Sequence, residues 1–157
     1  MRIENEIKLD FSDVLIRPKR STLSSRKEVD LTRNYTFRHS KLNWSGVPIM
    51  AANMDGVGTF QMAKTLQEHK LFTCMVKSYD VSAWVENSVL LSKDNIAVST
   101  GISNQDFNKL KEVLTQCSTI KFICIDVANG YSEYFGDFIE RVRTEFPDKT
   151  IIAGNVV

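Results

Sequence analysis

Short apolar segments alternate with amphipathic segments along most of this chain. The apolar segments begin near Val47, Leu71, Ile96, Lys121 and Thr150, at intervals of about 25 residues. They read as continuous apolar runs rather than alternating ones, which is typical of parallel strands that are covered on both faces. The pattern therefore predicts five buried strands.

Between these segments, apolar residues recur with helical spacing, which predicts four helices. The second predicted helix carries Trp84 and Leu91 on its apolar face, and the fourth ends before Pro147. Each predicted helix follows a residue suited to capping its first turn: Thr59, Asp80, Ser103 or Asn104, and Ser132.

Repeated strand–helix units with short connections predict an α/β fold with a parallel sheet, and two architectures share that repeat. A doubly wound nucleotide-binding sheet usually carries GxGxxG after its first strand, but the loop AANMDGVGTF has only Gly56 and Gly58. A (β/α)8 TIM barrel needs about 250 residues. We therefore expect residues 1–157 to form the N-terminal portion of a single TIM-barrel domain, about its first five βα units, with residues 1–46 as an extension leading into the barrel.

The composition is that of an ordinary globular domain, with 43 % hydrophobic and 25 % charged residues. A net charge of +1 gives no reason to expect nucleic acid or a membrane surface as a partner. No apolar run approaches the roughly 20 residues that span a bilayer, and the charged start MRIENEIKLD is unlike a secretory signal. We expect a cytoplasmic protein.

The cysteines are Cys74, Cys117 and Cys124, an odd count in apolar segments. They show no CxxC or His-rich spacing of the kind that indicates a metal site. We expect three buried thiols and no metal ligands.

Polar residues stand where several predicted strands end. In a barrel, the C-terminal ends of the strands form the active-site face. Asp and Asn also cap helices and shape turns, which is the alternative for any one of them. Their recurrence on several strands favours a ligand site, and the residues concerned are Asn53, Asp55, Lys77, Asp126, Asn129 and Asn155.

Four segments carry a family resemblance: KLDFSDVLIRPKRSTLSSR, WSGVPIMAANMDGVGTF, FICIDVANGYSEYF and TIIAGNVV. Together they resemble the N-terminal half of the GMP reductases, within the IMP dehydrogenase/GMP reductase family. The segments PIMAANMD and DVANGYSE favour the reductase branch. The resemblance implies NADPH-dependent reductive deamination of GMP to IMP and ammonia, in purine salvage, by a homotetramer. A nucleophilic cysteine and a potassium site are expected only in the C-terminal half of the family's barrel.

The resemblance also implies roles for single residues. Lys77 matches the family lysine near the reacting centre and the cofactor, where an ammonium can orient or stabilise charge. The cofactor-binding segment of the family is matched by Asp126, Val127 and Ala128, and a carboxylate there can accept hydrogen bonds from ribose hydroxyls.

Two further pairs are matched in the same way. Ser25 and Arg26 match residues that reach the cofactor, which can belong to a neighbouring subunit, and a guanidinium there suits a phosphate. Met54 and Asn155 match residues that line the nucleotide pocket.

The chain departs from the family pattern at three positions. Gly56 replaces the threonine of the usual MDTVGT, and VKSY replaces HKHY, so that Val76 and Ser78 stand beside Lys77. None of the three cysteines lies where the family nucleophile does, so we expect the 157 residues alone not to reduce GMP.

Two other functions stay open. One is an IMP dehydrogenase-type enzyme, against which DVANGYSE, Lys77 and the lack of a visible regulatory insertion argue. The other is a non-catalytic half-barrel that binds nucleotide weakly or serves as an assembly partner.

Overall fold

The computed structural model describes residues 3–156 and divides the chain into two compact units, Met1–Asp30 and Leu31–Val157. The first unit is irregular apart from two short 3-10 turns, η1 (Phe11–Asp13) and η2 (Arg26–Glu28). All of its described residues are exposed.

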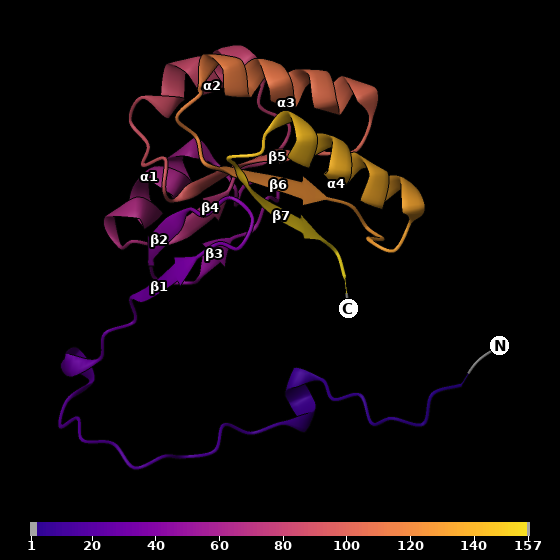
Figure 1. Ribbon diagram of the computed structural model, residues 1–157. Coiled ribbons are helices and arrows are strands. Elements are labelled where there is room, and N and C mark those ends of the chain that lie inside the picture. Colours follow the sequence, from indigo (N-terminus) through magenta and orange to yellow (C-terminus); the bar gives the residue numbers. More distant parts are fainter. Residues whose placement is uncertain (1–2, 157) are drawn as a thin grey trace. The chain divides into compact units, whose positions relative to one another are not determined.

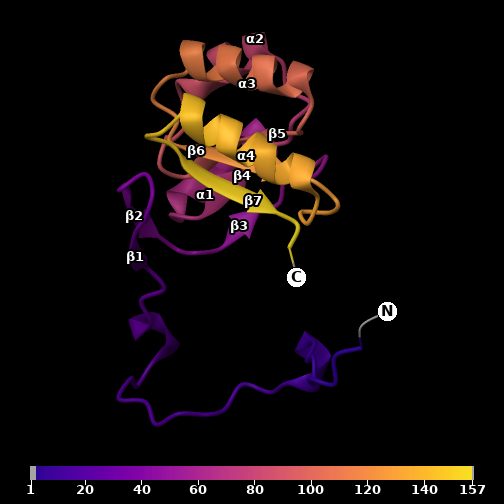
Figure 2. The same cartoon turned by 45° about the vertical axis from the view of Figure 1, so that its right-hand side comes forward.

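The second unit is built on a five-stranded parallel sheet (Figures 1 and 2). Its strands lie in space in the same order as in the sequence, from β3 to β7. A doubly wound sheet would reverse its order at a switch point, so the order shows the barrel arrangement. The sheet is open, with β3 and β7 at its two edges, and the predicted partial barrel is confirmed. The strands are β3 (Met50–Ala51), β4 (Phe72–Cys74), β5 (Ile96–Thr100), β6 (Phe122–Asp126) and β7 (Thr150–Gly154).

The four predicted helices are confirmed, and each begins at a capping side chain. Thr59, Asp80, Ser103 and Ser132 each accept a hydrogen bond from a backbone N–H in the first helical turn. Of the two candidates for the third helix, Ser103 is the cap. The helices are α1 (Phe60–Glu68), α2 (Val81–Ser88), α3 (Asn104–Gln116) and α4 (Glu133–Glu145).

Two sequence predictions about element lengths were wrong. The second helix ends at Ser88, so Leu91 lies beyond it, although its side chain is buried in the same core. The first two strands are also shorter than the apolar segments VPIMA and LFTCMV, because only two and three residues pair with a neighbouring strand.

The two faces of the sheet belong to different cores. Ile96, Val98 and Ile123 point to the outer face, where all four helices cover them (Figures 1 and 2). Ala97 and Phe122 point to the inner face, in a smaller cluster. The helices therefore cover the outer face alone, because parallel strands alternate their side chains and a barrel keeps its helices outside.

A hairpin that the sequence analysis did not predict covers the start of the inner face. Its strands are β1 (Arg33–Thr36) and β2 (Asn43–Gly46), paired antiparallel. The buried Trp44 ring packs edge-on against Phe72 at 6.4 Å, and Phe37 packs against Phe122 at 5.7 Å. These aromatic contacts fix the hairpin against the sheet.

Candidate functional site

The carboxyl edge of the sheet, where its strands end, gathers polar side chains from distant segments. Asp126 is the last residue of β6, and its Oδ2 accepts a hydrogen bond from Asn53 Nδ2 at 3.0 Å. Asn53 lies in the loop after β3, so this bond joins two strand ends that are not neighbours in the sheet. It uses one carboxylate oxygen, and the second oxygen can accept hydrogen bonds from a ligand.

Backbone hydrogen bonds continue from β6 and β7 into the loops beyond them. Val127 N–H donates to Gly154 O at 2.8 Å, and Asn155 N–H donates to Val127 O at 2.9 Å. Gly130 N–H then donates to Asn155 O at 2.8 Å, and a Cβ on Gly130 would lie 2.5 Å from that oxygen. The structure thus brings Val127 and Gly130 beside Asn155 at the carboxyl edge.

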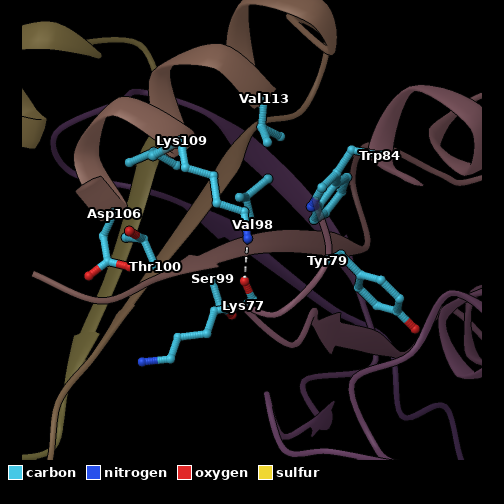
Figure 3. Close-up of a pocket in the computed structure, with 10 residues that line it drawn as sticks. Lys77, Tyr79, Trp84, Val98, Ser99, Thr100, Asp106, Lys109 and Val113 are labelled. Carbon is cyan, nitrogen blue, oxygen red and sulfur yellow. Dashed lines mark hydrogen bonds between the residues drawn. The ribbon is translucent and has the colours of Figure 1, made fainter. Parts of the chain in front are cut away.

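Lys77 follows β4 at the same edge, and its backbone is held by a neighbouring helix. Lys109 of α3 donates from Nζ to the Lys77 carbonyl at 2.7 Å (Figure 3). Figure 3 shows the exposed Lys77 side chain extending away from Trp84 and Val113. The residue therefore has a fixed backbone and a side chain that can reach a ligand at the edge.

The cavity beside Lys77 is small. It measures about 10 Å³, which is room for about one water molecule. A ligand larger than a water molecule would therefore have to bind over the open carboxyl edge rather than inside this cavity.

The loop after β3 is anchored to the end of β4 by its glycine. Val76 N–H donates to Gly58 O at 2.8 Å, and Val57 and Gly58 both donate to Met54 O. The Met54 side chain is exposed beside this turn. Gly56 has a φ of 75°, a conformation that a β-branched residue rarely adopts, so glycine at this position suits the loop as it is folded.

The two positions flanking Lys77 differ in their surroundings. Val76 is buried, where an apolar side chain packs well, whereas Ser78 is exposed. Of these two departures from the family pattern, only Ser78 has a side chain exposed to solvent beside Lys77.

Ser25 and Arg26 belong to the separate unit Met1–Asp30. The Ser25 hydroxyl accepts a hydrogen bond from Lys27 N–H at 3.3 Å and so caps η2, while Arg26 is exposed in that turn. Their assignment to a cofactor stays a prediction.

Sequence reasoning missed two supporting contacts of the site. The sequence indicated that Asn53 is a polar residue at a strand end, but not that it is the hydrogen-bond partner of Asp126. Nothing in the sequence indicated the contact of Lys109 with Lys77, because Lys109 lies on a helix 32 positions further along the chain. Within residues 3–156, no group of three or more His, Cys, Asp or Glu side chains could hold a metal ion. No helix in that span is long and apolar enough to cross a membrane.

Comparison with known proteins identifies relatives along the whole chain. Residues 8–157 match the family model described as the IMP dehydrogenase / GMP reductase domain. A GMP reductase of Vibrio parahaemolyticus is 55 % identical over 160 residues, which cover 100 % of this chain and 46 % of that protein. A GMP reductase of Caenorhabditis elegans is 56 % identical over 159 residues, covering 99 % and 44 %.

A solved structure is similar in fold. The crystal structure of inosine 5'-monophosphate dehydrogenase from Legionella pneumophila matches with a TM-score of 0.72 at 24 % identity. The match covers 93 % of this chain and 43 % of that one. The chain spans about half the length of the curated relatives it matches.

Proposed function

Because the chain belongs to the IMP dehydrogenase / GMP reductase family, we propose that it supplies the N-terminal half of a GMP reductase. The proposed reaction is the reductive deamination of GMP to IMP and ammonia with NADPH, in the cytoplasm and within a homo-oligomer. The observation that carries this proposal is 55 % identity to a GMP reductase along 100 % of the chain. The dehydrogenase structure shares only 24 %, which favours the reductase over the oxidising reaction.

The geometry of the carboxyl edge supports a binding role for Asp126. Its carboxylate is oriented by Asn53 and lies at a strand end, where it can accept hydrogen bonds from the ribose hydroxyls of NADPH. Val127 and Ala128 continue the proposed cofactor segment, and Asn155 and Met54 are proposed to line the nucleotide pocket. Ser25 and Arg26 are proposed to bind the cofactor as well.

Lys77 is the proposed catalytic residue of this half. NADPH supplies a hydride when it is bound, and the residues of this chain bind and orient the reactants. The Lys77 ammonium is a compact charge with three donors, placed on a backbone that Lys109 fixes. It is suited to stabilising the charge that develops as ammonia leaves.

The experiment that tests the proposal compares this chain with a version extended through the rest of the barrel. We expect GMP-dependent oxidation of NADPH only in the extended protein, with one IMP formed for each NADPH consumed. The reason is that the family nucleophile lies in the second half of the barrel. Turnover by the 157 residues alone would show that the second half is dispensable. An extended protein that folds but neither consumes NADPH nor binds GMP would contradict the reductase assignment.

The open sheet favours one alternative function. Both edge strands, β3 and β7, have a paired neighbour on one side only, and unpaired edges promote association. A non-catalytic half-barrel that assembles with another polypeptide would use these edges. A stable complex of the 157-residue chain with a second polypeptide, without any turnover of GMP, is the result that favours this alternative.

Replacing Asp126 with asparagine in the extended protein should weaken NADPH binding about tenfold or more. The substitution keeps the size of the side chain but removes the charge-assisted hydrogen bonds, which contribute about 1.5–3 kcal/mol each. Asp137→Asn is the matched control, because Asp137 is a carboxylate inside α4, where it lies near Glu140 and Arg141 rather than at a strand end. Fluorescence titration with NADPH measures both. Equal losses in the two variants would refute a specific role for Asp126.

A further inference from the structure

Three sulfur atoms lie together on the inner face of the sheet. The Cys74 thiol donates to the Met50 thioether, with 3.7 Å between Sγ and Sδ. Cys74 and Cys124 belong to the same buried cluster on this face. We call Met50, Cys74 and Cys124 the sulfur cluster.

The layering of a barrel explains why these residues meet. Alternate strands of a barrel contribute side chains to the same interior layer. β4 and β6 are such strands, and the rings of Phe72 and Phe122 meet at 5.0 Å in one layer. Two residues further along each strand, Cys74 and Cys124 form the next layer. The side chain of Ala97, which pairs with Cys74 on the strand between them, is small enough to let the two thiols approach each other.

A neighbouring hydroxyl is also directed at this pair. Ser99 pairs with Cys124 across the sheet, is only 7 % exposed, and its hydroxyl has no hydrogen-bond partner within residues 3–156. A buried hydroxyl without a partner is costly unless a ligand or an ionised neighbour uses it.

The spacing of the strands favours a bridging ion over a disulfide. Strands that have one strand between them lie about 9.5 Å apart. A disulfide requires Cα atoms within about 7 Å, so a direct bond between Cys74 and Cys124 would require the backbone to move. A metal ion that binds sulfur at about 2.3 Å instead spans sulfur atoms about 3.7 to 4.6 Å apart.

We propose that Met50, Cys74 and Cys124 form a three-sulfur binding site for a soft monovalent metal ion, Cu(I) above all. Two thiols and a thioether are the ligands that select Cu(I) among the common metals. A structural zinc ion takes four ligands and prefers thiolate, imidazole and carboxylate, so this set does not suit it.

The inner face offers an entry path to the site. Cys74 and Cys124 are 4 % and 8 % exposed, whereas Met50 is 51 % exposed. Met50 also lines an apolar pocket of about 270 Å³ beneath the hairpin, together with Phe72 and Phe122. A flexible thioether at the mouth can accept the ion first and pass it to the buried thiols.

The test is a Cu(I) titration of the full chain, under reducing and oxygen-free conditions, against a chromogenic Cu(I) chelator. We expect one tight equivalent, with an ultraviolet sulfur-to-copper charge-transfer band. Cys74→Ser and Cys124→Ser should each lower the affinity by a factor of about 100 or more, and Met50→Leu by about 10. Silver(I) should compete for the same site because it shares the preference for sulfur.

Cys117→Ser is the matched control. Cys117 is a third buried thiol, hydrogen-bonded to Ser88 at 3.3 Å and packed in the outer core. Its variant should bind Cu(I) as the parent does. Equal losses in all three cysteine variants, or unchanged binding in the Cys74 and Cys124 variants, would overturn the proposal.

A second measurement needs no variant and so does not depend on how a substitution affects folding. The alkylation rate of each cysteine in the parent chain, read by mass spectrometry, should fall with Cu(I) at Cys74 and Cys124 but not at Cys117. Equal protection of Cys117, or protection of neither inner thiol, would contradict the site. Neither measurement depends on GMP or NADPH, so the outcome is separate from that of the proposed reductase activity.

Discussion

Gly58→Ala should destabilise the fold by about 3 kcal/mol, the largest effect we expect from adding a single methyl group. A Cβ at this position would overlap the carbonyl oxygen of Cys74 and lie 2.9 Å from both Ala52 O and Val76 N. These are backbone atoms at the carboxyl edge, and they cannot move away as easily as the end of a flexible side chain can. The substitution should also break the bond from Val76 N–H to Gly58 O.

Urea unfolding, followed by circular dichroism, measures this effect. Gly136→Ala is the control, because Gly136 lies inside α4 and nothing stands within 4 Å of an added Cβ. Alanine is the better helix former, so this variant should be more stable by about 0.5–1 kcal/mol. If the free energy of unfolding of Gly58→Ala lies within about 1 kcal/mol of the parent value, the loop after β3 is not packed tightly against β4.

Lys77→Met in the extended protein should reduce kcat for GMP reduction by a factor of about 100 to 1000 while changing the KM for GMP little. A group that stabilises charge only in the transition state contributes on this scale. Methionine keeps the length of the side chain and removes its charge. The Lys77 backbone should stay in place, because Lys109 holds it through the carbonyl, which the substitution leaves unchanged.

Lys111→Met provides the comparison for this variant. Lys111 is a surface lysine on α3 that forms an ion pair with Glu145, and its loss should leave kcat unchanged. Steady-state NADPH oxidation with saturating GMP gives kcat for both variants. If Lys77→Met keeps more than half of the parent kcat, the lysine has no catalytic part.

Local features of the sequence determined where the helices begin and which segments form the barrel strands. A capping side chain and the first turn of its helix are only a few residues apart, so the signals at Thr59, Asp80 and Ser132 depend on little else. The same holds for the burial of the three cysteines, which apolar neighbours in the sequence predict and which the structure confirms.

The hairpin shows where local signals fail. The four residues of β1 are all exposed, so no apolar periodicity marks them as a strand. What holds the hairpin are contacts of Phe37 with Phe122 and of Trp44 with Phe72, across long stretches of chain. Propensity within a short window cannot report such contacts.

The candidate site and the sulfur cluster were decided by tertiary structure in the same way. The sequence placed Asp126 and Asn53 at strand ends, but only the curvature of the sheet brings two non-adjacent strands close enough for their 3.0 Å bond. Cys74 and Cys124 gave no metal-site spacing because 50 positions separate them, yet barrel layering places them side by side. Sequence spacing fixes which face of a strand a side chain takes, and the stagger and curvature of the sheet decide which side chains it meets there.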